Sequence, residues 1–168
     1  MTASPALLAQ APGRLGEPAR PAPGYALAAA HGGSGTSTLA ALLNLAGDPG
    51  LAVEPGTVSE QHFLARPRRV LVVARTHAAG LNAAALLLDR LKHHHPVLAL
   101  VADAPAPPPQ ICAYRIRVLA GRGPLVRIDY LPALRAADEL AQIADQPRTR
   151  RLAAHILDQL ARAPEVTR

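Results

Sequence analysis

The sequence alternates between short, continuously apolar segments and longer segments whose apolar residues recur at helical spacing. The clearest apolar segment is RVLVVA (Arg69–Ala74), whose β-branched and uninterrupted apolar character is typical of a parallel strand covered on both faces. Three other segments are interpreted as strands: Tyr25–Ala30, Pro96–Ala102 and Pro124–Leu131. Because strands that alternate with helices form parallel sheets with helices on both faces, we predict a three-layer α/β fold with a mostly parallel sheet of about four to five strands.

Helical segments separate the predicted strands and close the chain. Proline near their starts, and glycine or proline near their ends, mark several of their limits. Helices are predicted over the ranges Thr38–Leu45, Gly80–His94, Pro108–Gly121, Pro132–Ala144 and Thr149–Ala163. Residues 51–67 are irregular and are expected to hold at most a short strand or one helical turn.

The length of 168 residues predicts a single domain over residues 24–163. Residues 1–23, with five prolines among small residues, are expected to form a flexible arm, and residues 164–168 a tail. The start of the chain lacks the basic and apolar regions of a signal peptide, and no apolar run is long enough to span a membrane. Cys112 is the single cysteine and lies in an apolar helical pattern, so we expect a core residue and a cytoplasmic location.

A glycine cluster lies between the first predicted strand and the first predicted helix. A Gly-rich turn that opens a helix presents backbone N–H groups to anions, so this turn is a candidate phosphate site. Its candidate phosphate-binding residues are Gly32, Gly33, Ser34, Gly35, Thr36, Ser37 and Thr38. Two alternatives are an ordinary strand-to-helix turn with a hydroxyl cap and a Rossmann-type loop that has Thr38 in place of its third glycine.

The stretch HGGSGTSTLA resembles the phosphate loop of the ParA/MinD-type P-loop ATPases, whose pattern is K-G-G-x-G-K-[ST]-[ST]. Gly32, Gly33 and Gly35 match its three glycines. Ser37 falls on the hydroxyl that holds Mg²⁺ in that family, and Thr38 on the residue after it. The resemblance extends more loosely over residues 25–163. It implies a P-loop-like fold, ATP or another nucleotide with Mg²⁺ as ligand, and a bacterial role in DNA partitioning, conjugation or secretion.

The departures from that pattern remove its catalytic groups. His31 and Thr36 stand where the pattern has lysines, and Lys92, the only lysine of the chain, lies on a distant predicted helix. The strand that should end in a Mg²⁺-ordering aspartate ends instead in Ala74 and Arg75. Because phosphoryl transfer depends on positioned positive charge and Mg²⁺, we expect little or no hydrolysis of ATP or GTP. The leading hypothesis is a catalytically degenerate NTPase-like protein that acts as a binding, scaffold or regulatory component.

Three further residues are candidates for contact with a ligand. Ligands of parallel α/β sheets bind beyond the carboxyl ends of the strands, where RTHAAG (75–80) and DAPAPP (103–108) are expected to meet the Gly-rich loop. There His31 and Arg75 are candidates to supply positive charge. Asp103 is a candidate contact for a base or ribose, with a helix cap as its alternative role.

The chain carries a net charge of +6, almost entirely from arginine, which permits binding to nucleic acid or to an acidic partner. Aromatic residues make up only 2%, which argues against a module that stacks bases on aromatic rings. A protein partner and oligomerisation are expected, while an NTPase completed by a partner and an arginine-rich nucleic-acid adaptor are the alternative functions. The predicted arginine clusters are Arg66, Arg68, Arg69 and Arg75; Arg115, Arg117, Arg122 and Arg127; and Arg148, Arg150 and Arg151.

Overall fold

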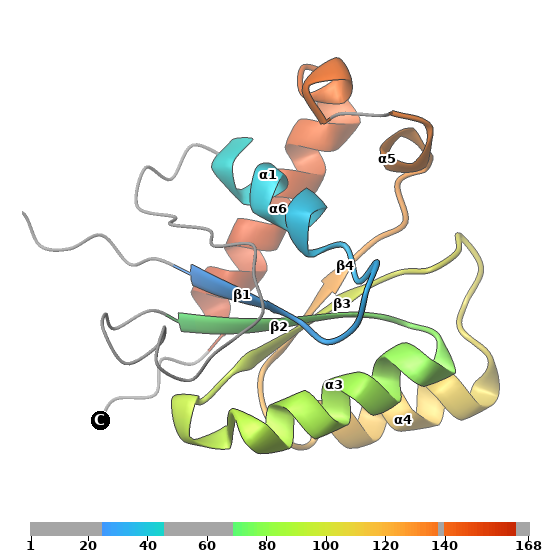
Figure 1. Cartoon of the computed structure of the whole chain (residues 1–168). Coiled ribbons are helices and arrows are strands. Elements are labelled where there is room, and N and C mark those ends of the chain that lie inside the picture. Colours follow the sequence, from blue (N-terminus) through green and yellow to red (C-terminus); the bar gives the residue numbers. More distant parts are fainter. Residues whose placement is uncertain (1–24, 46–68, 138–139, 164–168) are drawn as a thin grey trace, which may run out of the picture.

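The computed structural model describes residues 25–45, 69–137 and 140–163, which form a parallel sheet between two layers of helices (Figure 1). The strands are β1 (Tyr25–Ala29), β2 (Arg69–Arg75), β3 (Val97–Val101) and β4 (Leu125–Ile128). They lie in the order β1-β2-β3-β4, and each neighbouring pair is parallel. The predicted three-layer α/β fold is therefore confirmed.

Helices cover both faces of this sheet (Figure 1). The helices are α1 (Thr36–Leu45), α3 (Ala78–Arg90), α4 (Gln110–Ala120), α5 (Pro132–Ala136) and α6 (Pro147–Arg162), with short 3-10 helices η1 (Lys92–His94) and η2 (Leu140–Ile143). The helices α1 and α6 pack on one face, and α3 and α4 pack on the other. All four strands therefore lead toward one shared carboxyl edge.

Side chains of β2 enter both cores in alternation. Leu71 and Val73 pack toward α1 and α6, whereas Val70 and Val72 pack toward α3 and α4. Each is at most 1% exposed, and burial of such a side chain stabilises the fold by roughly 1.5–3 kcal/mol. This two-sided burial explains why the strand is continuously apolar. Cys112 is buried in the core beneath α3 and α4, as predicted.

The helix predicted over residues 80–94 differs from the observed one at both ends. α3 begins two residues earlier, at Ala78, and ends at Arg90, after which η1 forms a single tighter turn. His95 then adopts a left-handed conformation with φ of 47°. A residue that precedes proline is disfavoured in the helical region, so Pro96 accounts for the stop before β3.

The single helix predicted over residues 132–144 is wrong, because the chain breaks it into α5 and η2. Ala137 is extended, with φ of −91° and ψ of 133°. Leu134 packs against the core beneath α1 and α6, and Ile143 is only 6% exposed. These two residues are nine positions apart, which is about two and a half helical turns. A continuous helix would place them on opposite sides, whereas the break allows Ile143 to be buried while Leu134 packs, partly buried, against the core.

Arg69 and Arg75 lie at opposite ends of β2, so the predicted cluster of Arg66, Arg68, Arg69 and Arg75 is not one surface. Their Cα atoms are six residue steps apart along the strand, which is about 20 Å. The Arg69 guanidinium donates to the carbonyl oxygens of Leu160 (2.9 Å) and Ala163 (2.7 Å). Carbonyls at a helix C-terminus carry partial negative charge, so Arg69 stabilises the end of α6.

Other predictions fall on segments outside the described residues. These are the arm at 1–23, the irregular segment at 51–67 and the tail at 164–168. Within the described ranges, no helix has both the length and the apolar character needed to cross a bilayer.

Candidate functional site

The Gly-rich loop joins the carboxyl end of β1 to the N-terminus of α1, as predicted. Gly33 and Gly35 have φ values of 73° and 93°, a region that residues with a Cβ atom rarely adopt. The first backbone bond of α1 runs from the N–H of Leu39 to the carbonyl of Gly35 over 2.8 Å. The turn therefore places the start of α1 at the carboxyl edge of the sheet.

The first N–H groups of α1 have no partner within the helix. Those of Gly35, Thr36, Ser37 and Thr38 donate to no acceptor among the residues that the structure describes. Unpaired N–H groups at a helix N-terminus, together with the helix dipole, attract anions. The side chains of Ser37 and Thr38 are exposed beside them, so this end of α1 is open to a ligand.

Two loop hydroxyls face inward instead. Ser34 and Thr36 are 2% and 9% exposed, and their hydroxyl oxygens lie 2.7 Å apart in a hydrogen bond. Thr36 stands where the resembling pattern has a phosphate-contacting lysine. Its hydroxyl therefore stabilises the inside of the loop, and the loop presents its backbone to the edge of the sheet.

His31 links the loop to β2. Its Nδ1 lies 2.9 Å from the carbonyl oxygen of Gly32, and its Nε2 lies 3.2 Å from the backbone nitrogen of Arg75. The backbone N–H of Arg75 must be the donor, so Nε2 accepts and Nδ1 carries the proton that is donated to Gly32. Both contacts require the uncharged ring. His31 therefore positions the loop, and in this arrangement it supplies no positive charge.

Gly80 allows the N-terminus of α3 to approach this link closely. A Cβ atom at Gly80 would lie 2.6 Å from the carbonyl oxygen of Arg75 and 2.9 Å from Nε2 of His31. His77 caps the same helix, because its Nδ1 accepts the N–H of Gly80 over 3.0 Å. Its ring lies 5.1 Å from the ring of His31, centroid to centroid. His77 was not among the predicted site residues.

Arg75 connects the loop with the end of β3. Its Nε donates to the carbonyl oxygen of Gly33 over 2.8 Å, and its Nη1 lies 3.2 Å from Oδ1 of Asp103. Its side chain is 21% exposed. The Arg75 side chain therefore lies between the Gly-rich loop and Asp103, at the carboxyl end of β2.

Asp103 has a second basic partner that the sequence did not indicate. Nη2 of Arg135, from α5, lies 3.5 Å from Oδ1 of Asp103 and 3.4 Å from its carbonyl oxygen. The backbone N–H of Asp103 also donates to Oγ1 of Thr76 over 3.0 Å. Two arginines therefore share one carboxylate, and the group carries an excess of one positive charge.

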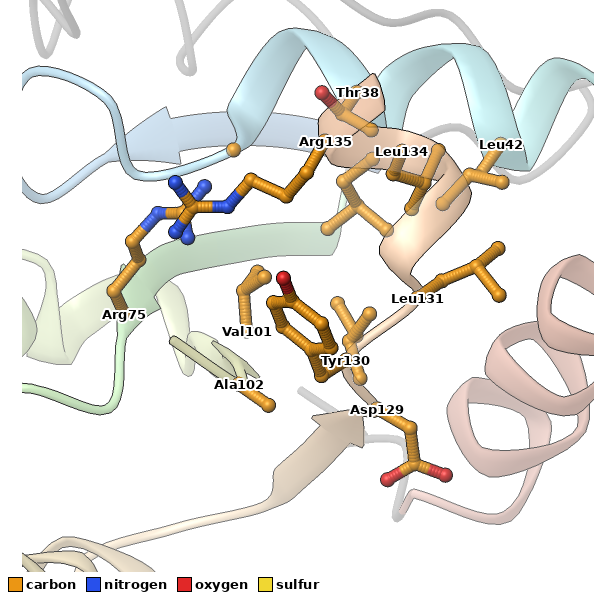
Figure 2. A pocket seen from close by; sticks show the side chains of 13 residues that line it. Thr38, Leu42, Arg75, Val101, Ala102, Asp129, Tyr130, Leu131, Leu134 and Arg135 are labelled. Carbon is orange, nitrogen blue, oxygen red and sulfur yellow. The ribbon is translucent and has the colours of Figure 1, made fainter. Parts of the chain in front are cut away.

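A small pocket opens where these elements meet, and its volume is about 60 Å³, room for a few water molecules. Figure 2 shows the side chains of Arg75 and Arg135 converging from two sides of it. The pocket is lined by Gly35, Thr38, Leu39, Leu42, Arg75, Val101, Ala102, Ile128, Asp129, Tyr130, Leu131, Leu134 and Arg135. Its rim is cationic at the loop and its remainder is mainly apolar.

The residues around the pocket do not fit a Mg²⁺ site. Magnesium prefers oxygen ligands in an octahedral arrangement and is usually held by one or two carboxylates. Asp103 is engaged by two arginines, and the Asp129 carboxylate points away from them (Figure 2). Within the part of the chain that the structure describes, no group of three or more His, Cys, Asp or Glu residues is placed to hold a metal ion. Among residues 25–45, 69–137 and 140–163, the exposed Ser37 hydroxyl, the predicted metal contact, therefore has no group of carboxylates to complete a site.

The single lysine lies far from the loop. Lys92 lines a hollow with Pro96 and Pro124, which immediately precede β3 and β4. This hollow lies at the amino edge of the sheet, opposite to the Gly-rich loop. The positive charge at the loop therefore comes from arginine.

No protein-family model matches this sequence, and a search of curated proteins finds no similar sequence.

Proposed function

We propose that this protein binds the phosphate end of a nucleotide, or of a similar phosphate ester, at the carboxyl edge of the sheet and does not hydrolyse it. One observation carries the proposal: Gly35 and Thr38, at the open N-terminus of α1, line the same pocket as Arg75 and Arg135, and the backbone N–H groups of residues 35–38 have no acceptor among the described residues. Amide rows and guanidinium groups are the donors that proteins use for oxyanions.

The shape of the pocket favours a ligand with an anionic end and an apolar end. Val101, Tyr130, Leu131 and Leu134 line the part beyond the arginines. Apolar side chains with a few convergent polar groups are typical of small-molecule sites, where the polar groups fix orientation. A base or another planar apolar group would contact this wall, and only part of a nucleotide would enter the observed volume.

The proposal excludes efficient hydrolysis on chemical grounds. Phosphoryl transfer requires charge positioned on the transferred group and a metal that neutralises it. Lys92 is at the wrong edge, and Asp103, the carboxylate bonded to Arg75 within the described ranges, is held by two arginines and is not free for Mg²⁺. The protein would then act by binding its ligand and presenting the bound state to a protein partner. The resemblance to ParA/MinD-type ATPases suggests DNA partitioning, conjugation or secretion as the setting.

Calorimetric titration with ATP and ADP tests this function, alongside an assay of phosphate release in the presence of Mg²⁺. Wild type is expected to bind and to release no phosphate. Gly35→Asp places a carboxylate among the N–H groups at the start of α1 and should abolish binding. Arg135→Gln removes one of the two guanidinium groups and should weaken binding. Circular dichroism shows whether each variant is folded. Absence of binding by wild type, or metal-dependent turnover that Gly35→Asp removes, would overturn the proposal.

A further inference from the structure

We infer that phosphate binding at this pocket does not require Mg²⁺, because the guanidinium of Arg75 neutralises the phosphate oxygens, as the metal does in P-loop enzymes. The inference rests on the proposed function and deepens it, since it names the form in which the ligand binds. It predicts that the pocket takes the free phosphate ester in preference to its Mg²⁺ complex.

The place of Arg75 in the fold supports this role. It is the last residue of β2, the strand that pairs with β1, and so lies directly beside the loop. Its Nε donates a hydrogen bond to the carbonyl oxygen of Gly33, and its backbone N–H donates one to His31. These two bonds hold Arg75 in position before a ligand binds. Its 21% exposure leaves the guanidinium accessible at the pocket rim.

The donor count shows that the group has capacity to spare. A guanidinium carries five N–H donors in a planar fork. Arg75 uses one at Gly33 and one at Asp103, which leaves three for a ligand. A planar fork matches two oxygens of a phosphate, so the group can bind in a bidentate manner.

The surrounding charges disfavour a divalent cation at the same place. The carboxylate that is bonded to Arg75 in the described part of the chain, that of Asp103, is shared with Arg135. A Mg²⁺ ion at the loop would be repelled by two guanidinium groups. To coordinate Asp103 it would have to displace the ion pairs that Asp103 forms with both arginines. A ligand already complexed with Mg²⁺ also carries less negative charge, so its attraction to the two arginines is weaker. Chelation of the metal should therefore leave affinity unchanged or raise it.

The test is calorimetric titration of the full chain with ATP and with ADP at constant ionic strength, once with EDTA and once with excess Mg²⁺. Wild type is expected to bind in EDTA at least as tightly as in Mg²⁺. Arg75→Gln should weaken binding in EDTA about ten- to hundred-fold, the value of a charge-assisted contact. Arg75→Lys keeps the positive charge but loses the planar fork of donors. Its affinity in EDTA should lie between those of wild type and Arg75→Gln.

Arg117→Gln is the matched control, because Arg117 is exposed on α4, on the opposite face of the sheet from α1. This variant should bind the ligand as tightly as wild type does. Thermal melting of the variants separates loss of folding from loss of binding. Binding that requires Mg²⁺ would overturn the inference while the proposed function stands. Binding in EDTA that Arg75→Gln leaves unchanged would overturn the role of Arg75. Binding in neither condition would overturn both the inference and the proposed function.

Discussion

Nε of Arg75 donates a 2.8 Å hydrogen bond to the carbonyl oxygen of Gly33, so the last residue of β2 holds the middle of the Gly-rich loop. The backbone N–H of the same arginine is bonded to the ring of His31, one residue before that loop. The loop is therefore fastened to the sheet by one residue at two points. The same guanidinium also forms an ion pair with Asp103, which follows β3. Any anion that binds at this edge would meet a loop whose position is already set.

The close approach of α3 to this link makes Gly80 sensitive to substitution. Gly80→Ala places a Cβ atom 2.6 Å from the carbonyl oxygen of Arg75, which is backbone and cannot rotate away. We expect the free energy of unfolding to fall by about 1–3 kcal/mol, the usual cost of overpacking. Urea denaturation followed by circular dichroism measures it.

Gly32→Ala is the control for this prediction. A Cβ atom at Gly32 meets nothing within 4 Å, and its φ is not positive. Its stability should lie within about 0.5 kcal/mol of wild type. Equal stabilities for the two variants would show that α3 does not approach the loop as described.

The buried pair of Ser34 and Thr36 predicts strongly non-additive mutations. Thr36→Val keeps the shape of the side chain but leaves the Ser34 hydroxyl buried without its partner, which should cost about 1–3 kcal/mol of stability. The double variant Ser34→Ala/Thr36→Val removes both hydroxyls and should lose less than the sum of the single variants. Denaturant unfolding of all four proteins gives the coupling energy, and strictly additive losses would argue against the hydrogen bond.

The sequence predicts most of the fold because its strongest signals are local. The uninterrupted apolar run of β2 indicates a buried parallel strand, and every interpretation of the glycine cluster places it in a turn between a strand and a helix. The broken helix at residues 132–144 was missed because its cause is tertiary. Packing of Leu134 against the core and burial of Ile143 together require a bend that no proline or glycine marks.

The site divides in the same way. The loop residues and the cation at Arg75 follow from the motif and from the end of a strand. Arg135 and His77 could not be predicted, because each acquires its role only when α5 and α3 fold onto the carboxyl edge. A histidine three residues before Gly80 is the one local hint, since a side-chain acceptor at that spacing caps a helix.

Asp103 should compete with the ligand for the two arginines. Asp103→Asn removes the carboxylate charge that Arg75 and Arg135 share, so phosphate affinity should rise several-fold. Stability should change by no more than about 1 kcal/mol, because the Asp103 side chain is 43% exposed. Calorimetric titration with ADP and urea denaturation measure the two effects.

Asp89→Asn provides the comparison, because Asp89 pairs with Arg122 over 3.4 Å and lines the hollow at the opposite edge of the sheet. It should leave phosphate affinity unchanged. A decrease in affinity with Asp103→Asn would show that Asp103 supports the ligand, for example through a ribose, and does not compete with it.

The central claim is that the unpaired N–H groups at the start of α1 bind a phosphate, and amide NMR tests it most directly. A ¹⁵N-labelled sample of the full chain is titrated with ADP in EDTA while every assigned amide signal is followed. The account predicts saturable shifts centred on Gly35, Thr36, Ser37 and Thr38, with a smaller effect at Lys92. Amides of residues 35–38 that stay in place while ADP is added, or shifts centred on the amino edge around Lys92 and Arg122, would contradict it.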